Sequence, residues 1–310
     1  MNELILHHYP MSPFAEKIRA IFGAKQITWK SVDIPRIMPK PDVVALTGGY
    51  RKTPILQIGA DIICDTALIA RKIDELVPEP QLYPDHVAVN AEVIAAWADS
   101  VLFNSAVPLA FQPQVMAETF AGREQELQAF AADRAAMRKG ATMPRTSLEN
   151  AKNILHRFVK NFECQLQNGQ AFVCGGFPCI ADFSIYHSLW FLWTKPIVCD
   201  ELTPYPAIMG WLQLMKEFGH GSQSELSSTE AIAIAKGAKT KVEPGHSVVE
   251  KFAVGDEITV QPTDYGIDPV QGKLLLCDEI ETVILRNDNR VGDVAVHFPR
   301  ANYAIEKVEQ

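Results

Sequence analysis

The sequence predicts three successive domains: an α/β domain, an all-helical domain and a small all-β domain. Strand and helix patterns are interleaved over residues 1–80, strand patterns disappear over residues 86–225, and short alternating strands return over residues 245–310. Residues 226–244 contain a short helix and a polar linker. The total of 310 residues suits two or three domains, at ~100–200 residues each.

The first domain has the order of elements of a thioredoxin-like fold. A strand over residues 4–8 is followed by a helix from Pro13, whose apolar residues recur at the spacing of one helix face. Residues 27–34 alternate as a second strand, so the strand–helix–strand unit implies a right-handed parallel crossover. A hairpin over residues 55–63 and a third helix from Asp65 complete the order βαβ then ββα.

The middle of the chain predicts a bundle of five or six antiparallel helices. The most regular pattern covers residues 148–166, where apolar side chains recur every three or four positions. Another apolar helix covers residues 185–192.

Charge and cysteine usage argue against several classes of function. The net charge of -8 does not favour a nucleic acid or an anionic membrane as partner. The chain shows no basic region at its start and no apolar run that reads as a signal or membrane segment, so we expect no membrane partner. The six cysteines form no C-x-x-C pair, so we expect no metal site, free thiols and a cytoplasmic location.

The turn Tyr9-Pro10-Met11-Ser12-Pro13-Phe14 joins the first strand to the first helix. Proline suits the first helical position because its missing N–H would be unpaired there anyway, so Ser12 lies near the N-cap, where partial positive charge gathers. This environment can hold an anion or lower the pKa of a thiol. A serine before proline is more often only a cap, yet our hypothesis is that this turn is the chemical centre.

Over residues 1 to about 220 the chain resembles the glutathione S-transferase superfamily. The resemblance depends on the Ser12-Pro13-Phe14 turn, on Lys52-Thr53-Pro54-Ile55-Leu56 and on Asp65-Thr66 at the start of the third helix. Each motif alone is weakly specific, whereas all three in this order make a strong match. The resemblance implies glutathione as cosubstrate, a small electrophilic molecule as second substrate, a homodimer and a role in detoxification.

The resemblance also implies how glutathione would be held. Pro54 would follow a cis peptide bond, and the backbone of Thr53 would pair with the cysteinyl part of glutathione. Asp65 and Thr66 would receive the γ-glutamyl end, and Lys52 could reach the glycyl carboxylate. The usual pair in the family is Glu-Ser, so Asp-Thr keeps the chemistry with a shorter acid.

The resemblance places Ser12 where serine-type members keep their catalytic hydroxyl, seven residues before Arg19. Ser12 would donate a hydrogen bond to the glutathione sulfur and favour the thiolate. Tyr9 is the alternative donor, because other subgroups use a tyrosine earlier in the same turn. The electrophile would bind along the first helix of the bundle, with Trp97, Phe103 and Asn104 as candidates.

Other functions are compatible with the same residues. Isomerisation, dehalogenation or peroxide reduction would use glutathione at the same site. The resemblance also implies a capping arrangement with a hydroxyl residue where this chain has Cys179, so Asp182 would cap the free N–H groups of the following helix. A non-catalytic binding or scaffold protein is the alternative from a different class, kept open by the departures at Asp65-Thr66 and Cys179.

The C-terminal residues lie outside the resemblance. Five short strands over residues 245–310 predict a small SH3-like barrel or a strongly bent sheet. Twelve acidic side chains against six basic ones in this range argue against nucleic acid. This domain would either cover the core or a partner subunit, or lie over the glutathione cleft and shape access, with His297 and Arg300 as contributors.

Overall fold

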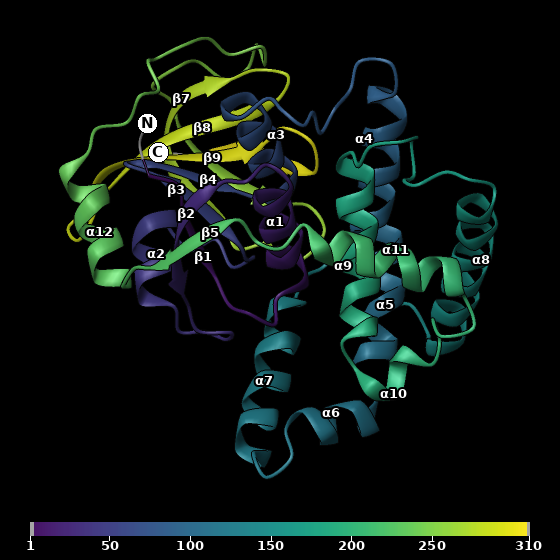
Figure 1. Ribbon diagram of the computed structural model, residues 1–310. Coiled ribbons are helices and arrows are strands. Elements are labelled where there is room, and N and C mark those ends of the chain that lie inside the picture. The colour runs from purple at the N-terminus through teal and green to yellow at the C-terminus, as the bar shows by residue number, and fades with distance from the viewer. Residues whose placement is uncertain (1–2, 309–310) are drawn as a thin grey trace.

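A computed structural model describes residues 3–308 and confirms the predicted thioredoxin-like domain. The first strand pairs in parallel with the second and antiparallel with the third, which forms a hairpin with the fourth. Helices connect these strands on both faces of the sheet (Figure 1). The elements are β1 (Ile5–His8), α1 (Pro13–Ala24), β2 (Thr28–Asp33), α2 (Pro41–Thr47), β3 (Ile55–Ile58), β4 (Asp61–Cys64) and α3 (Thr66–Leu76).

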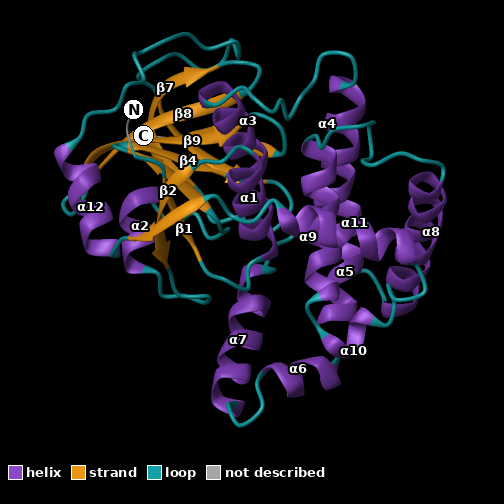
Figure 2. Ribbon diagram, in the orientation of Figure 1, coloured by secondary structure: helices purple, strands orange, loops and turns teal. Residues whose placement is uncertain are grey.

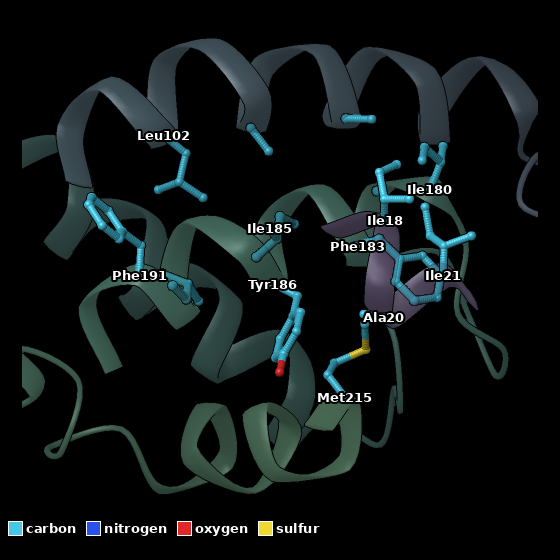
Figure 3. Packing of buried hydrophobic residues seen from close by; sticks show 14 of the residues in the cluster. Ile18, Ala20, Ile21, Leu102, Ile180, Phe183, Ile185, Tyr186, Phe191 and Met215 are labelled. Carbon is cyan, nitrogen blue, oxygen red and sulfur yellow. The ribbon is translucent and has the colours of Figure 1, made fainter. Parts of the chain in front are cut away.

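A helical domain follows, as predicted, and Figure 2 shows it as a separate mass of helices beside the sheet. Its centre is α9, which is apolar around almost its whole circumference and is buried accordingly. Ile18 and Ile21 of α1 lie beside Phe183 of α9, so the two domains share one core (Figure 3). The elements are α4 (Ala88–Trp97), η1 (Ala98–Leu102), α5 (Phe103–Ala110), α6 (Pro113–Thr119), α7 (Glu124–Met137), α8 (Leu148–Gln167), α9 (Ile180–Trp193), α10 (Pro196–Cys199) and α11 (Pro206–Glu217).

The helices α4, η1 and α5 form one continuous rod over Ala88–Ala110. By length and composition alone this rod is long and apolar enough to cross a membrane, so the expectation that the sequence has no such run was wrong. Polar residues such as Asn90, Glu92 and Asp99 interrupt the apolar run in the sequence. One side of the rod packs on α8 and α9, which is the arrangement of a core helix in a bundle.

The C-terminal residues form the predicted all-β region, and its strands join the N-terminal sheet. Strand β9 pairs in parallel with β4, with Ile62 opposite Val296. Within the described residues the result is one sheet of ten strands, in the order β10-β6-β7-β8-β9-β4-β3-β1-β2-β5. The added elements are β5 (Ser222–Glu225), α12 (Ser228–Gly237), β6 (Glu257–Pro262), β7 (Val270–Cys277), β8 (Glu281–Asp288), β9 (Gly292–Pro299) and β10 (Tyr303–Lys307).

The two faces of this sheet bury two different cores. Leu6 and Ile63 point to the face covered by α1, α3 and the helical bundle. Ile5 and Ile62, their neighbours in sequence, point to the face covered by α2 and α12, where Val296 of β9 joins them. Because side chains alternate between the two faces of a strand, residues of the C-terminal strands share a core with residues of the first domain.

Candidate functional site

Ser12 ends the turn after β1 and caps α1. Its backbone N–H donates to the carbonyl of Tyr9 at 3.1 Å, and its Oγ accepts from the N–H of Ala15 at 3.2 Å. The side chain is 2% exposed and lines the cleft between the domains. Because Oγ accepts in the cap, its own hydrogen stays available to a group in the cleft.

The buried side chain of Arg19 fixes the backbone of this turn. Its guanidinium donates to the carbonyl of Pro10 at 2.8 Å and pairs with Glu16 at 2.7 Å. It also contacts His8 Nδ1 at 2.9 Å, and burial together with this positive charge lowers the pKa of His8 to about 3. His8 is therefore neutral and accepts from Arg19, which fixes the backbone of the turn.

Every residue predicted for catalysis or for glutathione binding lines one cleft of about 1360 Å³. The turn supplies Tyr9 and Ser12, and the hairpin and α3 supply the rest. The Thr53–Pro54 peptide bond is cis, as the resemblance implied. The lining residues predicted for glutathione are Lys52, Thr53, Pro54, Asp65 and Thr66.

Asp65 adopts a strained backbone conformation at the start of α3. Its φ of 74° and ψ of 134° are sparsely populated by residues other than glycine, and such strain costs about 1–3 kcal/mol. The carboxylate accepts from the N–H of Ala67 at 2.9 Å and from the hydroxyl of Tyr303 at 3.0 Å. Tyr303 in turn contacts the hydroxyl of Tyr50 at 2.9 Å, so a C-terminal side chain orients the predicted γ-glutamyl ligand.

Lys52 is already paired. Its Nζ lies 2.6 Å from Asp264 and 4.4 Å from the ring centroid of Tyr265. Both partners belong to the loop after β6. The charge expected for the glycyl carboxylate is thus partly neutralised by the C-terminal region.

Lys40 is a second cation that sequence reasoning missed. It is buried, it lines the cleft, and its Nζ donates to Thr53 Oγ1 at 3.1 Å. Burial and the nearby charge of Arg134 lower its pKa to about 8. Within residues 3–308 it forms no ion pair, which leaves its charge available to a ligand. A lysine in a proline-rich loop gave no distinctive signal in the sequence.

The bundle side of the cleft is aromatic. Trp97, Phe103 and Asn104, the predicted electrophile-pocket residues, all line it. Phe14 contacts Phe103 with ring centroids 4.6 Å apart. Phe111, Phe191 and Lys195 also line this side and were not predicted.

The C-terminal region lies at the cleft, but not through the two residues expected. His297 is buried in β8–β9, 2.8 Å from Glu281, and does not line the cleft; nor does Arg300. Burial would lower the pKa of His297, yet the nearby carboxylates of Asp61 and Glu281 outweigh burial and raise it. The C-terminal residues that do line the cleft come from the loop after β6, from the β7–β8 turn, and from the β9–β10 turn with the strand residues beside it: Asp264, Tyr265, Glu279, Ile280, Pro299, Ala301, Asn302 and Tyr303.

A buried ion pair connects the domains below the site. Lys17 of α1 lies 2.6 Å from Asp99 of η1, and His187 of α9 lies 2.9 Å from the other oxygen of Asp99. Burial would raise the pKa of Asp99, but the charge of Lys17 and the bond from His187 outweigh it and lower the pKa to about 2. The π-helical turn aims Asp99 inward at this junction.

Asp182 caps α9 as expected. Its carboxylate accepts from the N–H groups of Cys179 and Val173 at 3.0 and 2.9 Å. Burial raises the pKa of Asp182 to about 6 and the pKa of Cys179 well above its usual range. A thiol held in the protonated form is unreactive, so the role of Cys179 is structural.

Comparisons with known proteins agree with this geometry. Residues 6–81 match the family model described as "Glutathione S-transferase, N-terminal domain", and residues 106–217 match "Glutathione S-transferase, C-terminal domain". No curated protein matches the chain in sequence.

One solved structure is similar to nearly the whole chain, and others are similar to about two thirds of it. A GST-like protein from Pseudomonas syringae is 42% identical, with a TM-score of 0.83 over 99% of this chain and 100% of that chain. A glutathione S-transferase from Rhodospirillum rubrum F11 is 17% identical, with a TM-score of 0.52 over 69% of this chain and 87% of that one. Glutathione S-transferase-I, solved with lactoylglutathione, is 15% identical, with a TM-score of 0.52 over 69% and 94% of the two chains. The chain therefore belongs to the glutathione S-transferase superfamily.

Proposed function

We propose that this protein is a glutathione transferase that joins the glutathione sulfur to an electrophilic carbon. The observation that carries the proposal is Ser12, a buried cap residue with a hydroxyl hydrogen left for the cleft. Around it the cleft presents cationic, anionic and backbone groups that suit the three parts of the tripeptide.

In the proposed complex, Asp65 and Thr66 bind the γ-glutamyl end, and the backbone of Thr53 binds the cysteinyl part. Lys40 binds the glycyl carboxylate, because its ammonium group forms no ion pair within residues 3–308 and lies beside Thr53. Lys52 contributes less, since Asp264 already neutralises it. These contacts direct the glutathione sulfur toward Ser12.

The chemistry then follows from lowering the pKa of the bound thiol. The Ser12 hydroxyl and the N-terminus of α1 stabilise the thiolate, and the thiol proton leaves to solvent. The sulfur lone pair forms a C–S bond with the electrophile. In a substitution the electron pair of the breaking bond leaves with the departing group; in an addition the resulting carbanion takes a proton from water.

We also propose a homodimer, as in the resembled family. Val89 and Val93 on the outer side of α4 are exposed, and Val93 is 64% exposed. A second copy that covers this side would remove apolar surface from water.

Calorimetry and turnover test the proposal together. We expect millimolar glutathione to bind, and 1-chloro-2,4-dinitrobenzene to yield the aryl thioether with release of chloride. Product analysis separates transfer from isomerisation and peroxide reduction. Absence of glutathione binding would reject the proposal and favour the scaffold function.

A further inference from the structure

The aromatic side of the cleft contains one buried lysine with no partner of opposite charge. Lys195 lies between α9 and α10, is 9% exposed and lines the cleft. Its Nζ lies 4.0 Å from the ring centroid of Phe191. Within residues 3–308 this side chain forms no hydrogen bond or ion pair. A buried cation without an anion is rare, because burial disfavours the charged form.

The rings beside Lys195 form a path that leads to the predicted catalytic turn. Phe191 lies 6.0 Å from Phe103 between ring centroids, and Phe103 lies 4.6 Å from Phe14. Phe111 closes the side with an edge-to-face contact to Phe191 at 5.9 Å. A flat apolar body fits against such rings, and a negative group at its far end would meet the ammonium.

Other cations in the cleft are already engaged or are placed differently. Lys52 pairs with Asp264, and the guanidinium of Arg138 donates to the carbonyl of Met143 at 3.0 Å. Lys40 belongs to the glutathione side, beside Thr53. Arg145 also lines the cleft, but it is exposed. Within residues 3–308, Lys195 is thus the buried cation without an ion pair on the aromatic side of the cleft.

We propose that this pocket takes an aromatic carboxylate, with its rings against Phe103, Phe111 and Phe191 and its anionic group on Lys195. Resting on the proposed function, this assigns the class of the second substrate: an aromatic electrophile that carries a carboxylate at the end remote from the reacting carbon. Burial also lowers the pKa of Lys195 to about 8, so the ammonium form still predominates at neutral pH.

Calorimetry with 1-naphthoate and the neutral isostere 1-naphthamide tests the pocket without glutathione. We expect wild type to bind the carboxylate at least tenfold more tightly. Lys195→Met should abolish that preference and keep the binding of the amide, whereas Lys195→Arg should retain most of it. Lys216→Met is the matched control, because Lys216 lies over Trp193 at 5.5 Å and does not line the cleft.

Several results would overturn the proposal. They are equal binding of the two compounds by wild type, no binding of 1-naphthoate, or an unchanged preference in a folded Lys195→Met variant. If Arg138→Met lost the preference for the carboxylate and Lys195→Met kept it, the carboxylate would be bound by Arg138, and the proposal would be wrong.

A second assay separates this inference from the proposed function. Carboxylate preference without glutathione turnover would support the pocket and reject the transferase. Turnover of 1-chloro-2,4-dinitrobenzene without carboxylate preference would do the reverse.

Discussion

The hydroxyl of Ser12 and the ring of Tyr9 both line the cleft, but their surroundings differ. Ser12 is fixed by the cap of α1 and by the Arg19 contacts behind the turn. Tyr9 has the ammonium of Lys40 at 5.7 Å from its ring centroid. The better-fixed donor is Ser12, so single substitutions at the two positions should have unequal effects.

Ser12→Ala should reduce kcat/KM roughly a hundredfold, because one hydrogen-bond donor to the developing thiolate is lost. The pH profile of kcat/KM should move toward the pKa of an unperturbed thiol, about 8.5. Glutathione binding by calorimetry should change little. Tyr9→Phe is the control and should leave the profile unchanged; the opposite result would transfer the role to Tyr9.

Lys40→Met should raise KM for glutathione roughly tenfold with a smaller change in kcat, because a charge-assisted bond to the glycyl carboxylate is lost. Lys52→Met should raise KM less, since Asp264 already neutralises that ammonium. Steady-state kinetics with glutathione varied at a fixed electrophile measures both. A larger effect at Lys52 would reverse the assignment.

A site residue could be predicted from the sequence only where it stands in a short local motif. Ser12, Lys52-Thr53-Pro54 and Asp65-Thr66 stand in short motifs that the sequence displays directly. Lys40 and Tyr303 reach the cleft only through tertiary packing, from a loop and from β10. Their local patterns are those of ordinary surface and strand residues, so sequence reasoning passed over them.

Helix α9 begins with a weak N-cap, which lowers the stability that this buried helix contributes. Cys179 occupies the N-cap position, and its thiol lies 3.5 Å from the Asp182 carboxylate. A serine hydroxyl could donate to the same carboxylate and accept from the helix more strongly.

Cys179→Ser should therefore raise the free energy of unfolding by about 0.5–1 kcal/mol, which corresponds to roughly 2 °C in Tm. Differential scanning calorimetry measures the change. Cys64→Ser is the matched control, because Cys64 is fully buried in β4 and caps no helix, and it should destabilise. Equal effects of the two substitutions would show that the cap is not the cause.

The pairing of β9 with β4 makes the C-terminal region part of the core rather than a removable cover. Deleting residues 245–310 should uncover Ile62 and its neighbours and yield a chain that binds a hydrophobic dye and aggregates. Tyr303→Phe is the control, since it alters the cleft and keeps the sheet. A soluble truncated chain with the near-ultraviolet circular dichroism of wild type would contradict this.

The Lys17–Asp99–His187 contacts between the two domains make the stability of the whole molecule depend on pH. The lowered pKa of Asp99 means that its ionised form stabilises the fold. This contribution is complete above the unfolded pKa near 4 and is lost as the pH falls toward about 2.

Wild type should thus lose ~2 kcal/mol of stability between pH 4 and pH 2 through this group. Asp99→Asn should be less stable at pH 7, since it leaves Lys17 buried without its counter-ion, and the gap to wild type should narrow in acid. Urea unfolding at several pH values measures the gap, with Asp200→Asn, an exposed aspartate, as control. A gap independent of pH would reject the role of Asp99.

Fold class and order of elements could be predicted because each domain repeats its own period along the sequence. The joining of the N-terminal and C-terminal strands into one sheet could not be predicted, because no local pattern specifies the long-range pairing of β4 with β9. The membrane-length rod of α4, η1 and α5 was missed for a different reason: Asn90, Glu92 and Asp99 break its apolar pattern in the sequence.

The same pairing has a consequence for how the protein is made. Strand β4 is synthesised well before β9, its partner in the sheet, because the whole helical domain lies between them in the sequence. At typical rates of synthesis the interval is ~10 s or more, during which the edge of β4 presents unpaired N–H and C=O groups. A nascent chain that has not yet reached β9 therefore keeps the edge of β4 open, and the sheet can close only after β9 has been synthesised.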